Sequence, residues 1–512
     1  MTVHARGAPV AVAAPAIVVD PVTVPRDAAG LVDVDACVRA LGPADVLESA
    51  DGIGWHYVLP HGRWRLVDDG HHSWLTANGR AVRDLGTDPF VAIDRVSSEL
   101  GAVPEAVDDP ELPALSGGLV GALAYDLGRR IERLPALATD DRGGDHLSLR
   151  VVEVVCAIAP GRDHALLLAR PLPAGYPGAD HPRRASQRRL DHARTRLADA
   201  ARRQAGPRPL DPDAGTPPVA PQVAWTSLAR EDHLAAVEAV LTAIGQGKVF
   251  QVNLAQRLSA RWPGDVHELY RSLRSNSPAA FGAALPDVGV ASISPETFLA
   301  VDGAQVVTRP IKGTRPRAPD AALDAALADD LATAAKDRAE NVMVVDLERN
   351  DLGRVCRPGT IRVPELTRVE GHPTVWHLVS TVQGELVAGT GYGELLRATF
   401  PCGSITGAPK IAAMGLIERL ERVRRGWYCG AIGFLAPGHA RLSVAISTAV
   451  LQPDGVVDHG AGGGIVADSD PSSEHAETLD KAAAFLRAVS ATRVVQTPPA
   501  QRTAPAPGAV RS

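Results

Sequence analysis

The sequence predicts an α+β fold with mainly antiparallel sheets. With 512 residues, 45% of them hydrophobic, the chain is long enough to bury a large core. Apolar spacing predicts short strands at residues 250–255, 288–294, 305–309 and 442–451, and helices at residues 321–349, 408–422 and 474–489. Because the strands are not regularly followed by crossover helices, a doubly wound parallel sheet is disfavoured.

The two ends of the chain and one internal stretch lack the patterns of regular structure. Residues 8–19 faintly resemble a secretory signal, but Pro9 and Pro15 interrupt the apolar run. We therefore expect flexible tails at residues 1–20 and 496–512. Six prolines within 204–222 predict a linker between an N-terminal region, 21–203, and a catalytic region, 223–495.

Composition excludes several classes of function. The net charge of -6 is spread along the chain, and the basic run at 182–196 is typical of a solvated helix, so nucleic acid is not an expected partner. No segment reaches the run of about 20 apolar residues that spans a membrane. Five single cysteines without C-x-x-C spacing indicate neither a zinc site nor a disulfide framework, which suits the cytoplasm.

The catalytic region opens with a clear helix and strand. Leu234, Val237, Leu241 and neighbouring apolar residues recur at helical spacing up to Gly245. In the strand that follows, apolar residues alternate with polar ones, so Gln251 and Asn253 share one face.

Two pairs of acidic residues are candidate metal ligands. Asp337 and Glu340, like Glu474 and Glu477, are three residues apart, which places both members of each pair on one helix face. Such pairs are commonly solvated surface charges. Here Asp337 and Glu340 precede an apolar segment, and Glu474 and Glu477 follow a glycine-rich stretch. In these surroundings the carboxylates are plausible ligands for a hard cation such as Mg²⁺.

Two small-residue segments suit an anionic ligand. The glycines at 460–464 allow backbone amides to approach a ligand closely, although neither a P-loop nor a dinucleotide motif is matched. Residues 403–410 combine Ser404 with glycines ahead of a predicted helix, an arrangement that can present a hydroxyl and amides to a carboxylate. A tight structural turn is the alternative for both.

Three ionisable residues are candidates for catalysis. Lys312 follows a strand and lies between Ile311 and Gly313, so a desolvated, nucleophilic amine is possible, although most lysines are exposed and inert. Glu296 follows another strand and would act as a general acid if burial raises its pKa. His377 taken alone is more often a core histidine.

These blocks together resemble the chorismate-utilising family, which includes anthranilate synthase component I, aminodeoxychorismate synthase component I, isochorismate synthase and salicylate synthase. The similar blocks are residues 294–299, 310–317, 335–355, 375–381, 400–416, 428–434 and 460–485, in family order, with fainter similarity at 47–49 and 116–132. The resemblance implies two large antiparallel sheets packed as a sandwich with flanking helices.

The resemblance also implies roles for the candidate residues. Glu340 and Glu477, supported by Asp337 and Glu474, would bind Mg²⁺, and Glu296 would protonate the departing C4 hydroxyl of chorismate. The residues implied to contact the substrate are Gly462, Gly463, Gly464, Ser404, Tyr428, His377, Gln251 and Thr314.

Two positions select among the members of the family. Isochorismate and salicylate synthases carry a lysine where this chain has Gln251, whereas the segment PIKGT around Lys312 is typical of aminodeoxychorismate synthases. The resemblance then implies that Lys312 adds at C2, that ammonia attacks C4, and that the product is 4-amino-4-deoxychorismate for folate or a secondary metabolite. No glutamine amidotransferase loop is present, so a separate amidotransferase subunit is implied.

One departure from the family pattern keeps alternatives open. Ser447 stands where the family usually has an arginine that holds the enolpyruvyl carboxylate, and Arg441 is a candidate replacement. The alternatives are an anthranilate synthase, in which Glu48 and Ser49 would help bind tryptophan, and a non-catalytic chorismate-binding paralogue.

Overall fold

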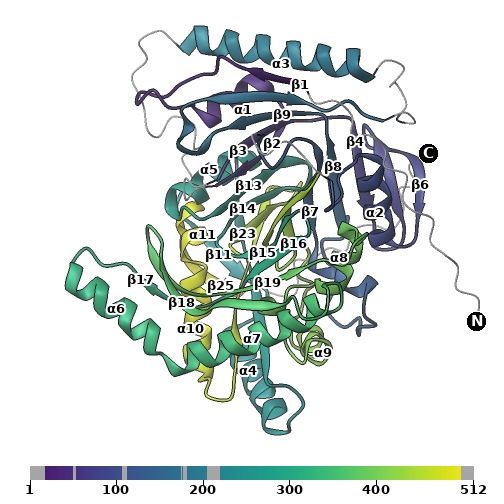
Figure 1. Ribbon diagram of the computed structural model, residues 1–512. Coiled ribbons are helices and arrows are strands. Elements are labelled where there is room, and N and C mark those ends of the chain that lie inside the picture. Colours follow the sequence, from purple (N-terminus) through teal and green to yellow (C-terminus); the bar gives the residue numbers. More distant parts are fainter. Residues whose placement is uncertain are drawn as a thin grey trace, which may run out of the picture.

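A computed structural model shows two large sheets packed against each other, with helices on their outer surfaces (Figure 1). The structure describes residues 18–49, 54–106, 112–173, 176, 182–204 and 220–496. Most of the predicted tails and most of the predicted linker fall outside these ranges, but residues 18–20 of the first predicted tail belong to a strand, β1 (Val18–Pro21). All described strand pairs are antiparallel except β11 with β25, so the predicted α+β sandwich of mainly antiparallel sheets is confirmed.

The first sheet has 13 strands. In spatial order they are β1 (Val18–Pro21), β10 (Ala165–Ala169), β9 (Val154–Ile158), β3 (His56–Pro60), β2 (Ala44–Glu48), β13 (Phe281–Leu285), β14 (Val290–Ser294), β23 (Thr448–Leu451), β24 (Val456–Ile465), β12 (Gln251–Arg261), β11 (Gln222–Thr226) and β25 (Ala491–Gln496), with β20 (Gly407–Ala408) beside β12.

The second sheet has 12 strands. In spatial order they are β17 (Ile311–Pro316), β19 (Val375–Glu385), β16 (Gln305–Arg309), β15 (Thr297–Asp302), β22 (His439–Val444), β21 (Ala431–Ala436), β7 (Gly118–Leu123), β8 (Leu147–Val152), β4 (Trp64–Asp68), β5 (Ser73–Ala77) and β6 (Arg80–Gly86), with β18 (Arg362–Gly371) beside β19.

Both sheets cross the boundary between the two sequence regions. In the first sheet, β2 from the N-terminal region pairs with β13 from the catalytic region, and Glu48 lies opposite Gly282. In the second sheet, β7 pairs with β21 in the same way. Apolar side chains of all four strands form one core between the sheets, where the rings of Tyr57 and Phe434 meet edge to face at 5.9 Å. The two sequence regions therefore share one structure.

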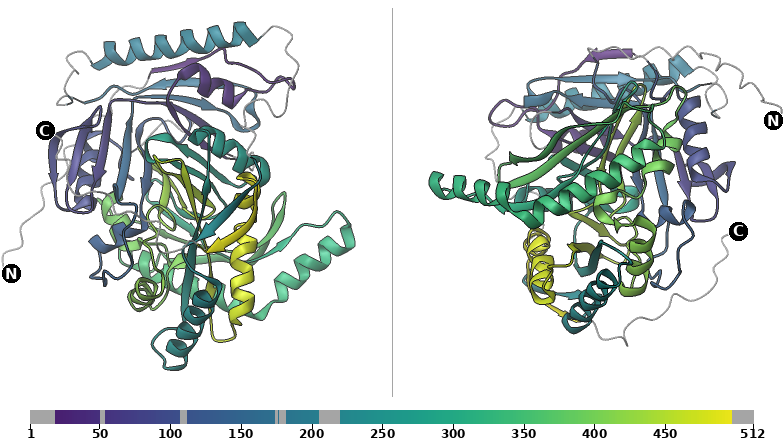
Figure 2. Two further views of the ribbon diagram at one scale, coloured as in Figure 1. Left: turned by 180° about the vertical axis from the view of Figure 1, so that it is seen from behind. Right: turned by 60° about the horizontal axis from the view of Figure 1, so that its bottom comes forward.

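Helices cover the outer face of each sheet (Figure 2). The first sheet packs against α1 (Val34–Leu41), α3 (Pro182–Gln204), α5 (Val266–Asn276), α10 (Pro471–Lys481) and α11 (Ala483–Ala488), with α4 (Arg230–Gly245) and α9 (Lys410–Leu420) on β12. The second packs against α2 (Pro89–Glu99), α7 (Ala335–Gly353) and α8 (Tyr392–Thr399), and α6 (Ala321–Thr333) lies against β17, β18 and β19.

Three predicted elements are each interrupted in the structure. The helix predicted at 321–349 is divided between α6 and α7 at Ala334, whose backbone is extended with ψ of 103°. The helix predicted at 474–489 is likewise divided between α10 and α11. The strand predicted at 442–451 is divided between β22 and β23, with Ser447 between them at φ of 49°. Ala334 and Ala482 stand at the two helix breaks, and alanine is the residue that suits a helix best, so composition does not mark these two breaks.

Candidate active site

A cleft of 850 Å³ contains most of the residues that the sequence singled out. It is lined by residues of β17, β24, α7 and α10 and by the turn at Gly403–Ile405. The predicted residues on its wall are Glu296, Lys312, Thr314, Asp337, Glu340, His377, Ser404, Tyr428, Gly462, Gly464 and Glu477. Gln251, Gly463 and Glu474 do not line the cleft but adjoin residues that do.

Lys312 and Ser404 are joined across the cleft. Lys312 lies in β17, and its Nζ donates a 2.8 Å hydrogen bond to the backbone carbonyl of Ser404. Ser404 lies in the short turn Gly403–Ile405 that follows α8, and its side chain is only 3% exposed. The amine of Lys312 is therefore fixed in position while it still faces the cleft.

Glu296 is a buried carboxyl beside Lys312. It lies between β14 and β15 and is 3% exposed. Burial raises its pKa, although Lys312 and a hydrogen bond from Ser404 act in the opposite direction. The backbone N–H of Ile311 donates to Glu296 Oε1 at 3.4 Å. A carboxyl whose pKa burial raises, on the wall of a cleft, is suited to general acid catalysis.

Three of the four candidate metal ligands, Asp337, Glu474 and Glu477, are paired with cations in this structure. Glu474 is buried and its Oε1 lies 3.1 Å from Lys336 Nζ, while Glu477 Oε1 lies 2.7 Å from Lys481 Nζ. Arg315 lies 3.2 Å from Asp337. Among the described residues, no group of three or more His, Cys, Asp or Glu side chains is close enough to hold a metal ion.

The pKa values of Glu340 and Glu477 are shifted in opposite directions. Burial raises the pKa of Glu340 despite the nearby Lys312 and Lys336. Burial also opposes ionisation of Glu477, but Lys481, Lys336 and Lys312 together outweigh it and lower the pKa of Glu477. Carboxylate oxygens are the ligands that Mg²⁺ prefers, so the chemistry of this donor set fits Mg²⁺.

The glycines of β24 allow these side chains to approach the backbone. A Cβ on Gly464 would lie 2.2 Å from Gln251 Nε2 and 3.1 Å from Glu340 Oε2. A Cβ on Gly463 would lie 3.3 Å from Glu474 Oε2 and 3.6 Å from Glu477 Oε1. The glycine-rich segment is thus a regular strand that carboxylates of two helices face, rather than a tight turn.

Two rings, those of His377 and Tyr428, also line the cleft. His377 Nδ1 lies 3.0 Å from Thr314 Oγ1, and burial lowers the pKa of His377 to about 4, so its ring is neutral. Tyr428 is 8% exposed, and a Cβ on Gly460 would lie only 2.2 Å from its ring. These side chains therefore add uncharged rings to the cleft wall.

The replacement suggested for the missing arginine is wrong. Arg441 binds Asp302 at 2.7 and 2.9 Å and does not line the cleft. Its side chain instead contacts β15, where Nη1 also donates to the backbone carbonyl of Val301 at 2.7 Å. Ser447 itself lines the cleft.

Four further residues of the site were not predicted. Lys336 and Lys481 line the cleft and pair with its carboxylates; the spacing of four between Glu477 and Lys481 on one helix is a signal that predicts such a pair. Behind the cleft, Glu348 and Cys402 contact each other. Glu348 is eight residues after Glu340 on α7, which returns it to a similar side of the helix.

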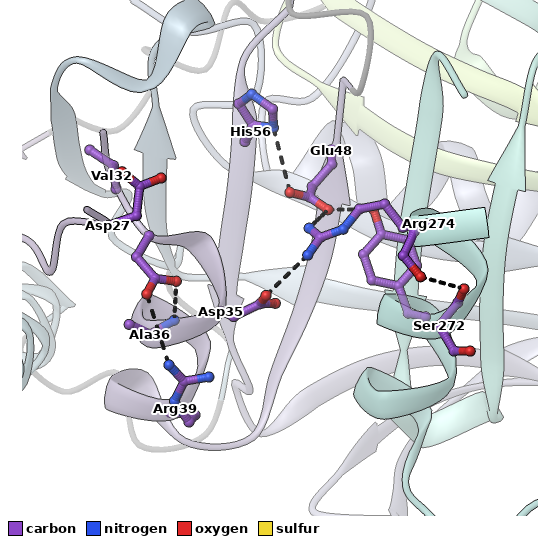
Figure 3. Close-up of polar contacts among 12 residues, drawn as sticks. Asp27, Val32, Asp35, Ala36, Arg39, Glu48, His56, Ser272 and Arg274 are labelled. Atoms are coloured by element: carbon purple, nitrogen blue, oxygen red, sulfur yellow. Dashed lines mark hydrogen bonds and ion pairs between the residues drawn. The ribbon is translucent and has the colours of Figure 1, made fainter. Parts of the chain in front are cut away.

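A second polar cluster surrounds Glu48 (Figure 3), and its residues are not among those that line the cleft. The hydroxyl of Tyr270 and Nη1 of Arg274 each lie 2.5 Å from Glu48 Oε2, and His56 Nδ1 lies 3.7 Å from Oε1. Arg274 also binds Asp35 at 3.0 Å. This cluster joins β2, β3 and α1 to α5.

The fold and the cleft together define an enzyme that binds a small molecule beside paired carboxylates and an amine. A family model described as chorismate binding enzyme matches residues 78–487. The chain belongs to the chorismate-binding enzyme family.

Relatives in this family carry more than one name. Aminodeoxychorismate synthase component 1 of Klebsiella aerogenes is 39% identical over 433 residues, covering 83% of this chain and 88% of the relative. Anthranilate synthase component 1 of Thermus thermophilus is 42% identical over 421 residues, covering 81% and 85%. The chain is therefore similar to both enzymes.

Solved structures agree with the fold. Anthranilate synthase component I from Streptococcus pneumoniae matches with a TM-score of 0.68 and 28% identity, covering 84% of this chain and 91% of that one. The menaquinone-specific isochorismate synthase from Escherichia coli matches with a TM-score of 0.65 and 19% identity, covering 93% and 95%.

No described helix is long and apolar enough to cross a membrane.

Proposed function

We propose that the chain is the chorismate-aminating component of an aminodeoxychorismate synthase. The observation that carries this proposal is the position of Lys312, whose amine is held 2.8 Å from the Ser404 carbonyl beside the buried Glu296. A nucleophile and an acid in one cleft suit displacement of a hydroxyl, which is a poor leaving group until it is protonated.

The proposed reaction has two displacements. The neutral amine of Lys312 forms a bond to C2 of chorismate while the C4 hydroxyl leaves as water with the proton of Glu296. Ammonia then forms a bond to C4, the bond between C2 and Lys312 breaks, and the neutral lysine is regenerated. The carboxylate of Glu296 takes the proton that the new C4 ammonium group releases, so the cycle is balanced.

Glu340 and Glu477, with Asp337 and Glu474 in support, would hold Mg²⁺. When bound, the metal supplies positive charge for a carboxylate of the substrate. Gln251, Gly462, Gly463 and Gly464 would shape this end of the cleft, and Ser404, Thr314, His377 and Tyr428 would contact the remainder of the substrate.

The nitrogen source would be ammonia from a separate glutamine amidotransferase subunit. Relatives that carry the name component 1 support a second component. The product would serve the synthesis of 4-aminobenzoate, for folate or for a derived metabolite.

Product analysis tests the proposal. With chorismate, Mg²⁺ and ammonium, we expect a product that yields 4-aminobenzoate only after a separate lyase is added. Fluorescent anthranilate formed without a lyase would instead establish an anthranilate synthase, the second candidate, which relatives up to 42% identical favour.

The covalent step has its own test. Intact-protein mass spectrometry with chorismate and no ammonia should reveal an adduct with the mass of chorismate less water. The Lys312→Ala variant should lack this adduct, while Lys248→Ala, at an exposed lysine outside the cleft wall, should keep it. Absence of an adduct at saturating chorismate would count against the lysine route.

A non-catalytic paralogue is the third candidate, because Ser447 replaces the usual arginine. Magnesium-dependent consumption of chorismate that Glu340→Ala abolishes would exclude it.

A further inference from the structure

A chain of buried polar side chains leads from Glu296 away from the cleft to Glu348. The Ser404 hydroxyl donates to Glu296, and Cys402 Sγ lies 3.4 Å from Ser404 Oγ. Glu348 Oε1 lies 3.3 Å from Cys402 Sγ, and Thr308 Oγ1 donates to Glu348 Oε2 at 2.8 Å. Each member of the chain is at most 4% exposed.

The surroundings of Glu348 favour its neutral form. Within the part of the chain that the structure describes, no lysine, arginine or histidine forms an ion pair with Glu348. The charged groups that face it are Glu296 and Asp351, and Lys410 binds Asp351 at 2.7 Å. Burial, reinforced by Glu296, raises the pKa of Glu348 to about 8.

The protonation of Glu348 determines the direction of the hydrogen bonds. With Glu348 ionised, Cys402 Sγ donates to Oε1 and Thr308 Oγ1 donates to Oε2. A neutral carboxyl instead has one O–H donor, and while Oε2 keeps the hydrogen bond from Thr308 that donor is at Oε1 and points to Cys402. The thiol can then donate to Ser404, and Ser404 to Glu296. An ionised Glu348 accepts from the thiol, so Cys402 Sγ has no hydrogen left for Ser404 and competes with Glu296 for the hydrogen of the Ser404 hydroxyl.

We propose that Glu348 is a positioning residue that, when neutral, orients the Cys402 thiol and the Ser404 hydroxyl to donate toward Glu296. The inference rests on the proposed function, in which Glu296 gives its proton to the departing hydroxyl. A hydrogen bond donated to Glu296 stabilises the negative charge that forms at that moment, so it increases the rate of the step.

Two substitutions of similar size separate donation from packing. Glu348→Gln keeps an N–H donor toward Cys402, whereas Glu348→Leu removes it. We expect kcat for chorismate consumption with ammonium at about pH 7 to be roughly 10-fold higher in the Gln variant than in the Leu variant, the effect of one charge-assisted hydrogen bond. The same order is expected between Cys402→Ser, which keeps a donor, and Cys402→Ala.

The dependence on pH distinguishes orientation from a purely structural role. The pKa of Glu348 is raised, so wild type carries the neutral group below about pH 8 and the ionised group above it. The glutamine amide does not titrate. The ratio of wild-type kcat to that of Glu348→Gln should therefore fall as the pH rises through about 8. Titrations of groups that do not interact with Glu348 cancel in the ratio.

The outcomes are separable. If wild type consumes no chorismate with Mg²⁺ and ammonium, the proposed function fails. If wild type is active but the ratio is constant from about pH 6.5 to about pH 9.5, or if the Leu and Gln variants are equally active, the role of Glu348 is overturned. Infrared spectra give a readout without turnover, because the protonated carboxyl band that Glu348→Gln removes should disappear as the pH rises through about 8.

Discussion

Glu48 and Glu296 are both buried carboxyl groups, but their surroundings differ in kind. Glu48 is enclosed by Tyr270, Arg274 and His56, which come from elements packed around it. Glu296 lies on the wall of a cleft of 850 Å³, beside Lys312. The first carboxyl is surrounded by partners within the protein, whereas the second has a side left for a ligand.

A buried charge stabilises the fold where other protein groups enclose it, and it can take part in chemistry where it reaches a cleft. Partners that enclose a carboxylate fix the elements that carry them, here α5 against β2 and β3. A carboxyl that is buried by its neighbours but still reaches a cleft has a shifted pKa and access to substrate. The comparison predicts separate losses of activity and of stability.

The largest expected effect is the loss of activity in Glu296→Gln. Without an acid for the leaving hydroxyl, kcat should fall by about 10² to 10⁴. Burial raises the pKa of Glu296, so wild type keeps this proton to higher pH than an ordinary glutamate and should lose activity as the pH rises through that pKa. Steady-state kinetics across pH measure both effects. If Glu296→Gln kept full activity, Glu296 would not act as the acid, and it would no longer differ in role from Glu48.

A smaller effect, on stability, is expected for Glu48→Ala. The Tyr270 hydroxyl would be left buried without its acceptor, and Arg274 would keep only Asp35. We expect the free energy of unfolding to fall by about 2–3 kcal/mol, measured by urea denaturation, with kcat changed less than about threefold. Asp35→Ala, at the more exposed end of the cluster, is the control and should cost about 0.5–1 kcal/mol. A large loss of kcat in folded Glu48→Ala would show that the cluster also acts on the cleft.

The smallest effect is expected for Ser447→Arg, which adds a cation to the cleft wall. Ser447 already has φ of 49°, so another non-glycine residue adds little backbone strain. A charge-assisted contact with a substrate carboxylate should lower the KM for chorismate by roughly 10-fold. Ser447→Gln, which is long but neutral, controls for size. An unchanged KM in both variants would mean that the carboxylate binds elsewhere.

Much of the fold followed from local patterns. The strand Gln305–Arg309 matches its predicted bounds, and the predicted helix at 234–244 lies inside α4. The breaks at Ala334 and at Ser447 could not be predicted from local patterns, because packing against other elements determines where the helix and the strand are interrupted. The helix predicted at 182–196 extends to Gln204 and buries Leu190 and Leu197, so it is solvated on one side only.

The candidate site was predictable where residues are close in sequence. The spacing of Glu474 and Glu477 places both on α10, which begins with the Asp470 cap and Pro471. The contact between Glu348 and Cys402 joins positions 54 residues apart and depends on how α7 packs against the turn at Gly403–Ile405. No local pattern contains that information.

The pairing of β2 with β13 limits how the chain can be shortened for practical use. A fragment that begins at residue 220 would keep every predicted catalytic group, but it would leave the edge of β13 without its neighbour in the sheet. Such an edge, with free N–H and C=O groups, invites pairing with other copies and aggregation. A minimal version of this enzyme for engineering must therefore retain β2, although β2 contributes nothing to the cleft wall.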